Sequence, residues 1–436
     1  MNTIFSKKTS FLVMILLMLL LGPYGDRQGS AIDRSTYKGL KTFNEVLDMV
    51  EKNYVEPVSA DKLLQGAING MIKSLDPHSS FMTEDMYKEL EVETRGSFGG
   101  VGIEITLVKD VLTVVSPIED TPAYKAGVKA GDQIIKINGD STKDITIMEA
   151  VKKLRGTKGT KVTITIMREG LAKPSDIELT RSIIVVKSIK SKIYNENIGY
   201  IRIASFQEHT GDDLLKAIKE IKAKAKPLAG IVIDMRNNPG GLLSQSIEVS
   251  DAFLKKGVIV STRGRSKNME SKAIARDDGD EPTCPIVIIV NEGTASAAEI
   301  VSGALQDNKR AVVLGTQTFG KGSVQTVIPL EGGSALKLTT AKYYTPNGRS
   351  IQAEGITPDI AVKQIAKTEE KNTEKEPAEN HSFREKDLKG HIKSPNEKNG
   401  KNEGEKKASP DNLDSDNQLK SAIDILKGLI ILTDKK

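Results

Sequence analysis

The sequence predicts a multidomain protein of mixed α+β and α/β class, with an N-terminal helical region, a small β domain, an α/β core and a polar tail that ends in a helix. Three changes in the spacing of apolar residues predict this organisation. The spacing is helical over 35–92, it alternates as in strands over 96–170, and apolar strands alternate with helices over 180–365. The 436 residues are enough for two or three domains. The net charge of +5 is small for this length and predicts no binding to nucleic acid.

Residues 1–31 have the features of a targeting segment. Lys7 and Lys8 precede an unbroken apolar run over 11–21, which suits a signal peptide but is short for a membrane span of about 20 residues. Gly29-Ser30-Ala31 provides a small-residue cleavage site. We therefore expect export to the periplasm or cell envelope. Cleavage of the segment and its retention as an anchor in the inner membrane both stay open.

The N-terminal helical region, 35–92, contains two runs of apolar residues at helical spacing. The first run ends at Pro57 and the second follows Ser59, and Asp76-Pro77-His78-Ser79 interrupts the pattern again. Two interpretations stay open: a packed pair of helices within one chain, or a surface through which two copies form a homodimer.

From Gly96 the sequence resembles a PDZ domain, a small β-barrel-like sandwich with helices, over 96–170. A glycine-rich loop leads into an alternating strand, Ala126 to Ile134 forms a distinctive Ala-Gly-Asp stretch, and Ile147 to Leu154 has amphipathic helical spacing. The loop residues that would bind a peptide through their backbone are Gly100, Val101, Gly102 and Ile103. Their N–H groups would receive a C-terminal carboxylate while the peptide adds as a strand to the sheet edge.

Residues 180–365 predict a largely parallel sheet covered by helices. The expected strands include 199–203, 230–235, 286–290 and 311–314, with helices at 210–225 and 296–305.

After Ile365 the chain is rich in Lys, Glu, Asn and Ser, which predicts a disordered linker over 366–415. Helical spacing returns over 416–434, preceded by a capping box of Ser415 and Gln418. We expect this helix to dock on the globular body; binding to a partner is the alternative.

A serine and a lysine in the core indicate a hydrolase that uses a Ser-Lys pair. Ser296 follows a buried strand and precedes a helix, so it lies near a helix N-terminus that favours a developing oxyanion. The N–H of Ala297 is the natural first oxyanion donor. Gly240 or Gly241 follows another strand, and its N–H group offers the second donor.

Lys321 lies between Gly320 and Gly322 and is the candidate base. A lysine serves as a base only when it is neutral, and desolvation favours the neutral amine. Gln325 is placed to hydrogen-bond this amine. The four histidines of the chain include none in a setting that suits a Ser-His-Asp triad.

Taken together, these segments resemble the carboxyl-terminal processing (tail-specific) proteases, which join a PDZ domain to a Ser-Lys protease core. The matching segments, in chain order, are 75–80, 100–103, 234–241, 291–297, 319–325, 344–349 and 355–360. The resemblance covers about 40–365. It implies a core of crotonase/ClpP-like type, Ser296 as nucleophile, Lys321 as base, Gln325 as its support, and Gly240 or Gly241 with Ala297 as oxyanion donors.

We therefore predict a serine endopeptidase that binds non-polar protein C-termini through its PDZ domain and needs no metal or cofactor. An activating adaptor and gating of the site by peptide binding are further expectations. Two alternatives remain: a catalytically silent PDZ adaptor that keeps the protease fold, and an acyl-thioester-processing enzyme of crotonase type.

Overall fold

The computed structural model describes residues 34–168, 170, 173–225, 227–266, 270–365, 384–393 and 416–433. The targeting segment predicted at 1–31 lies outside these residues, as does most of the predicted linker. The chain divides into two compact units between Gly70 and Met71. No helix in the described ranges is long and apolar enough to cross a membrane.

The first unit consists of helix α2 (Arg34–Asn53) and most of helix α3 (Ala60–Lys73). Both helices were expected from the spacing of apolar residues. No residue of α2 is buried. Its exposed apolar side chains recur at helical spacing, and they are Tyr37, Leu40, Phe43, Val46 and Met49.

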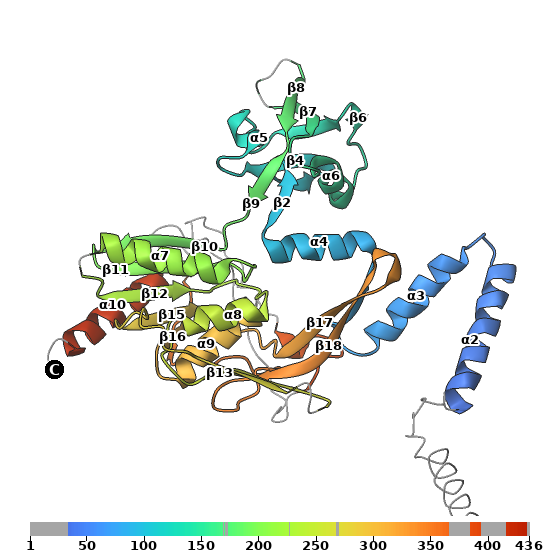
Figure 1. The fold of residues 1–436 in the computed structure, drawn as a ribbon. Coiled ribbons are helices and arrows are strands. Elements are labelled where there is room, and N and C mark those ends of the chain that lie inside the picture. Colours follow the sequence, from blue (N-terminus) through green and yellow to red (C-terminus); the bar gives the residue numbers. More distant parts are fainter. Residues whose placement is uncertain are drawn as a thin grey trace, which may run out of the picture. The chain divides into compact units, whose positions relative to one another are not determined.

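The second unit begins with a connecting segment and a PDZ-like β domain (Figure 1). Strand β1 (Ser80–Met82) and helix α4 (Glu84–Arg95) lead into it, and the Thr83 side chain caps α4. The sheet has the order β3-β4-β5-β7-β8, with β6 beside β5. Its strands are β3 (Ile103–Val108), β4 (Val111–Pro117), β5 (Gln133–Ile137), β6 (Asp140–Ser141), β7 (Lys161–Met167) and β8 (Ser175–Thr180). Helices α5 (Pro122–Lys125) and α6 (Ile147–Leu154) pack on this sheet around one apolar cluster.

A two-stranded ribbon joins this domain to the core. Strand β2 (Ser97–Gly100) enters the domain and strand β9 (Ser182–Val185) leaves it, paired antiparallel from Ser97 with Val185 to Gly100 with Ser182. Both chain connections of the domain therefore run through one ribbon.

The core contains the predicted covered sheet, in the order β10-β11-β12-β15-β16-β19. Every neighbouring pair is parallel except β10 with β11. The strands are β10 (Ile189–Tyr194), β11 (Ile198–Ile203), β12 (Gly230–Asp234), β15 (Ile286–Val290), β16 (Val312–Gly315) and β19 (Ile360–Ala361). The helices are α7 (Thr210–Lys224), α8 (Leu243–Asp251), α9 (Ala297–Asp307) and α10 (Asn417–Thr433).

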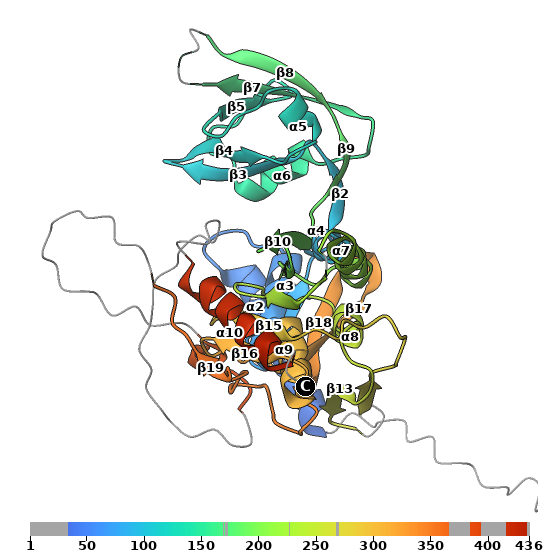
Figure 2. The same cartoon turned by 90° about the vertical axis from the view of Figure 1, so that its left-hand side faces the viewer.

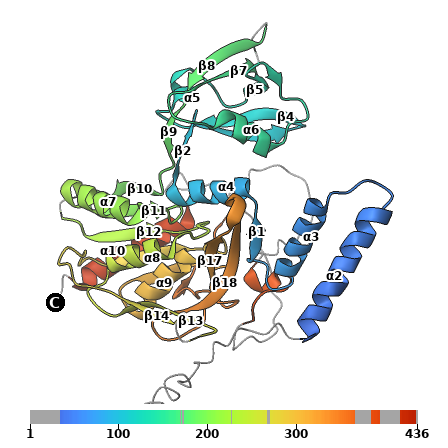
Figure 3. The ribbon, with the colours of Figure 1, turned by 45° about the vertical axis from the view of Figure 1, so that its right-hand side comes forward.

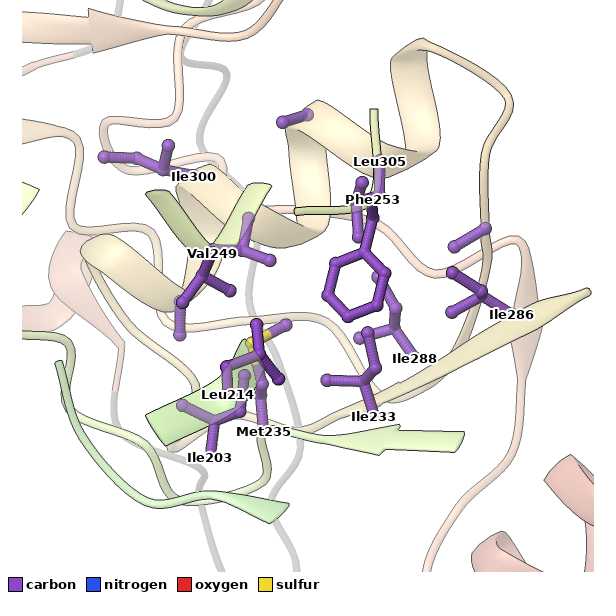
Figure 4. Packing of buried hydrophobic residues seen from close by; sticks show 14 of the residues in the cluster. Ile203, Leu214, Ile233, Met235, Val249, Phe253, Ile286, Ile288, Ile300 and Leu305 are labelled. Carbon is purple, nitrogen blue, oxygen red and sulfur yellow. The ribbon is translucent and has the colours of Figure 1, made fainter. Parts of the chain in front are cut away.

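Alternate residues of the central strands face different helices, because successive side chains in a strand point to opposite faces. In β12 and β15, Ile233 and Ile288 join the cluster with α7, α8 and α9 (Figure 4). Val232 and Val287 instead join the cluster with α10, which covers the opposite face (Figure 2). Burial on both faces explains why these strands are apolar throughout.

A second sheet is built around the hairpin of strands β17 (Ser323–Pro329) and β18 (Ala335–Tyr344), joined through a short turn, η2 (Glu331–Gly333) (Figure 3). Its order is β1-β18-β13-β14, with β17 also paired to β18. Strands β13 (Val258–Gly264) and β14 (Ser271–Ile274) complete it. Lys321 lies just before β17, so this hairpin sets the position of the loop that carries Lys321.

The tail differs from the prediction in two places. Within the predicted linker, residues 384–393 are described and contain a short helix, η3 (Glu385–Asp387), whose Glu385 is fully buried. The expectation of a linker that is disordered throughout is wrong for these residues. The polar composition gave no sign that one carboxylate, that of Glu385, is buried and hydrogen-bonded to residues of the core. Helix α10 docks on the core as expected, but Asp416 caps it by accepting a hydrogen bond from the N–H of Leu419. Ser415, the predicted cap, lies outside the described residues.

Candidate active site

Ser296 occupies the strand-to-helix turn between β15 and α9. Its backbone has φ 54° and ψ −114°, a conformation that costs energy for any residue other than glycine. Its residue exposure is 8%, so most of the side chain is shielded from water. Strain held in place by the surrounding structure is common at functional sites. The turn thus presents the serine at the N-terminus of α9, as the sequence predicted.

The glycine loop after β12 contacts this turn directly. A Cβ atom on Gly240 would lie 2.7 Å from the Cβ of Ser296, so only glycine fits there without a shift. The N–H of Ala295 donates to the carbonyl of Asn238 at 2.9 Å, and the Thr294 hydroxyl donates to the carbonyl of Met235 at 2.8 Å. The two loops are therefore fixed against each other.

The predicted oxyanion donors are not equivalent. The N–H of Gly240 donates to Oδ1 of Asn238 at 2.8 Å and is already occupied. Among the described residues, the N–H groups of Gly241 and Ala297 have no hydrogen-bond partner. Of the two glycines, Gly241 is therefore the better candidate for the second donor.

Lys321 lies in a largely desolvated setting. Burial is the main cause that lowers the pKa of its amine from the ordinary value, and the positive charge of Lys337 lowers it further. The negative charges of Glu385, Glu299 and Asp76 act in the opposite direction but are outweighed. A lowered pKa makes more of the amine neutral near physiological pH, which a base requires.

Glu299, on the first turn of α9, joins the serine turn to the lysine loop. Its side chain has no exposure, and its Oε2 accepts hydrogen bonds from the N–H of Ser296 at 2.8 Å and of Lys321 at 2.9 Å. Its Oε1 accepts from the N–H of Gly320 at 2.8 Å and from the hydroxyl of Thr318. One buried carboxylate therefore sets the distance between the two backbone segments that carry Ser296 and Lys321.

Gln325 lies beside the lysine loop, at an irregularity in the pairing of β17 with β18. Its Nε2 donates to the hydroxyls of Ser323 at 2.9 Å and of Thr339 at 3.3 Å. Within the described residues no hydrogen bond joins the Lys321 amine to Gln325 or to the Ser296 hydroxyl. The predicted roles of Gln325 and of the pair stay predictions.

The PDZ-like domain carries a groove beside its edge strand β3. The predicted loop residues Gly100, Val101, Gly102 and Ile103 line the groove, and side chains of β3 and α6 complete it. Strand β3 is at the edge of its sheet and so can accept another strand. The groove also contains Arg155, whose guanidinium stacks 4.4 Å from the ring centre of Phe98 and hydrogen-bonds Glu89 of α4.

Comparisons with known proteins agree with this arrangement. Family models match at residues 25–86 (Activating protease CtpB N-terminal domain), 89–167 (PDZ domain) and 197–362 (Peptidase family S41). The Carboxy-terminal-processing protease of Bartonella bacilliformis is 48% identical over 402 residues, which cover 91% of this chain and 90% of that protein. The chain belongs to peptidase family S41. It is a serine-type peptidase with a PDZ domain, as the sequence predicted.

Two further matches are more distant. The Carboxy-terminal processing protease CtpA of Bacillus subtilis is 39% identical over 318 residues, which cover 73% of this chain and 67% of that protein. A solved photosystem II D1 C-terminal processing protease is 29% identical with a TM-score of 0.45, over 74% of this chain and 92% of that one.

Sequence reasoning missed three acidic residues around the lysine: Glu299, Asp76 and Glu385. Each is buried and accepts several hydrogen bonds. Glu299 had a visible signal, because it is the one charged residue in the otherwise small and apolar stretch 297–305. Asp76 is in a segment that the sequence singled out, whereas nothing marked Glu385 within its Lys- and Glu-rich surroundings.

Proposed function

We propose that this peptidase processes proteins at their C-termini by Ser-Lys acyl-enzyme chemistry. The observation that supports it most is the four-donor carboxylate of Glu299, which ties the Ser296 turn to the Lys321 loop beside the glycine loop. In this proposal Ser296 attacks the peptide carbonyl and Lys321 accepts the serine proton. The N–H groups of Gly241 and Ala297 stabilise the oxyanion, and the Lys321 ammonium protonates the leaving amine.

The pair has no direct hydrogen bond in this structure, so the proposed reaction needs a small movement that brings the lysine amine to the serine hydroxyl. Binding of a non-polar C-terminus in the PDZ groove is the trigger we propose. Arg155 supports this, because it lines the groove and also contacts Glu89 of α4, the helix that connects the domain to strand β1. The matched CtpB N-terminal domain supports a role for an activating adaptor as well.

Replacement of either member of the pair tests the chemistry. Ser296→Ala and Lys321→Ala should each abolish hydrolysis of an unfolded protein substrate, with unchanged circular dichroism and melting temperature. Activity of the wild type should fall on acidification, since protonation of Lys321 removes the base. Wild-type turnover by either variant would refute the assignment and favour the catalytically silent adaptor.

We further propose export to the periplasm or cell envelope, with the segment at 1–31 as signal peptide or inner-membrane anchor. Fractionation of cells that produce the full chain tests this, and a cytoplasmic product would contradict it.

The exposed apolar stripe of α2 supports a homodimer formed through the N-terminal helices. Phe43→Asp should then convert a dimer into a monomer in light scattering.

The core type is also part of the proposal. A nucleophile at the N-terminus of a helix, beside an oxyanion loop from the neighbouring parallel strand, suits the crotonase/ClpP-like type. The PDZ groove favours a polypeptide substrate over an acyl thioester. Hydrolysis of an acyl thioester but not of a polypeptide would support the rival enzyme class.

A further inference from the structure

The tail segment 384–393 places a buried carboxylate beside the lysine loop. Glu385 has no exposed surface, although the tail around it is polar. Its carboxylate lies 2.7 Å from Nε2 of His78 and accepts a hydrogen bond from Nε2 of Gln352 at 2.8 Å. Burial of a polar group is costly unless it is hydrogen-bonded, and here His78 and Gln352 both contact the carboxylate.

These contacts reach the lysine loop from both ends. The backbone N–H of Glu385 donates to the carbonyl of Phe319 at 3.2 Å, two residues before Lys321. On the other side, Oε1 of Gln352 accepts from the N–H of Gly322 at 3.0 Å, one residue after Lys321. The tail residue therefore holds the loop directly before the lysine and through Gln352 after it.

A second series of contacts runs from Glu385 toward Gln325. The backbone N–H of His78 donates to Oδ1 of Asp76 at 2.8 Å, and the Thr339 hydroxyl donates to the same oxygen at 3.1 Å. Thr339 in turn accepts from Nε2 of Gln325 at 3.3 Å. The Asp76-Pro77-His78-Ser79 segment, which had no assigned role, thereby connects the tail carboxylate to the predicted support of the base.

We propose that Glu385 is a positioning residue for the base, and that the tail segment 384–393 is an integral part of the catalytic site. The inference rests on the proposed role of Lys321. Glu385 acts through His78 and Gln352, and it contributes a negative charge near the lysine amine.

The charges around Lys321 make this proposal testable through the pH dependence of activity. They come from Lys337 on β18, Glu299 on α9, Asp76 before β1 and Glu385 in the tail. Glu385 raises the pKa of Lys321, so its neutralisation lowers that pKa further. The pH below which activity falls must then move to a lower value, a change that a purely structural role would not cause.

The test uses the full chain with Glu385→Gln, which keeps the shape and removes the charge. We expect kcat to fall by about tenfold or more with KM changed by less than about threefold, as for a lost interaction that acts on the base. The acid limb of the kcat–pH profile should move to lower pH. Asp387→Asn, which changes an exposed carboxylate in the same short helix, is the matched control and should leave both quantities unchanged.

A second pair of variants keeps the proposal testable if Glu385→Gln folds poorly. His78→Asn removes the partner of Glu385 and should also lower kcat more than it raises KM. Replacement of 384–393 by a Gly-Ser segment of equal length should lower kcat as well. Higher activity in that variant would overturn the proposal, because it would mean that the segment covers the site. An unmoved acid limb in Glu385→Gln would overturn it too; activity in Lys321→Ala would instead refute the proposed function itself.

Discussion

Glu299 concentrates four hydrogen-bond donors on two oxygen atoms with no exposure to water. A glutamine at this position has one acceptor oxygen, so two donors would face an amide N–H instead. Each buried donor left unpaired costs about 1–3 kcal/mol. Glu299→Gln should therefore lower the free energy of unfolding by about 3 kcal/mol and reduce kcat by at least about tenfold. Urea denaturation and steady-state kinetics measure both effects.

Glu292→Gln is the matched control, because Glu292 lies in the loop just before α9 and accepts a side-chain hydrogen bond from Thr316. It should change neither the free energy of unfolding nor kcat appreciably.

Burial raises the pKa of Glu299 from 4.5 to about 7, so the folded state binds the Glu299 proton more tightly than the unfolded state. Its contribution to stability is therefore greatest below pH 4.5 and is lost as pH rises to about 7. If Glu299→Gln kept this pH dependence of the free energy of unfolding, another titrating group would have to cause it.

At this scale the sequence predicted where Ser296 and Lys321 lie relative to the strands and helices, but not which groups hold them in place. Ser296 and Lys321 follow from small-residue settings at strand ends, because those settings are visible in the order of residues. Glu299 resembles an ordinary residue of a helix's first turn, and its four donors come from segments up to 22 residues away. The difference between Gly240 and Gly241 was equally hidden, because it depends on where the Asn238 side chain points.

Helix α10 is attached to the core by an ion pair with the loop that leads to Gly240 and Gly241. Both Nη atoms of Arg236 donate to the carboxylate of Asp416, at 3.0 and 2.7 Å, and all three groups of the network are buried: Arg236, Asp416 and Asp234. Burial raises the pKa of Asp234, but the hydrogen bonds and charge of Arg236 outweigh this and lower it overall. The C-terminal helix thus neutralises an arginine that lies two residues before Asn238.

Asp416→Asn should lower the free energy of unfolding by about 2 kcal/mol, since Arg236 keeps its pair with Asp234 but loses charge-assisted hydrogen bonds to the buried carboxylate of Asp416. Activity should fall as well, because Arg236 adjoins the loop that ends at Gly241. Asp424 lies on the exposed face of α10 and pairs with Lys427 at 3.4 Å, so Asp424→Asn should change stability by less than about 0.5 kcal/mol. Equal effects of the two substitutions in urea denaturation would contradict the proposed role of the ion pair.

Elements with their own periodicity were predictable, and elements that depend on distant partners were not. Strand β15 and helix α6 have the predicted bounds, because apolar spacing and the Thr146 cap are local. The helix η3 has no such spacing and exists through contacts with His78, Phe319 and Gln352. Those contacts span more than 300 residues of chain in the case of His78.

The PDZ domain and the peptidase core belong to one chain, and the PDZ groove and Ser296 lie in different parts of it. The loop at 100–103 lines the groove beside β3, whereas Ser296 lies in the core. If the groove recruits a substrate through its C-terminal carboxylate, removal of that carboxylate should slow cleavage, even though the cleaved bond is unchanged. A peptide with a free non-polar C-terminus should therefore have a kcat/KM about tenfold or more above that of its C-terminal amide.

A charge in the groove separates this effect from other causes. Val151 lines the groove on α6, and Val151→Glu would repel a carboxylate there, so it should reduce cleavage of the free peptide to the level of the amide. Val115→Glu is the matched control, since Val115 is exposed on β4 and does not line the groove. It should keep the preference for the free C-terminus. If Val151→Glu kept the preference too, the carboxylate would have to be recognised in the core, and the peptidase would select its substrates without the PDZ groove.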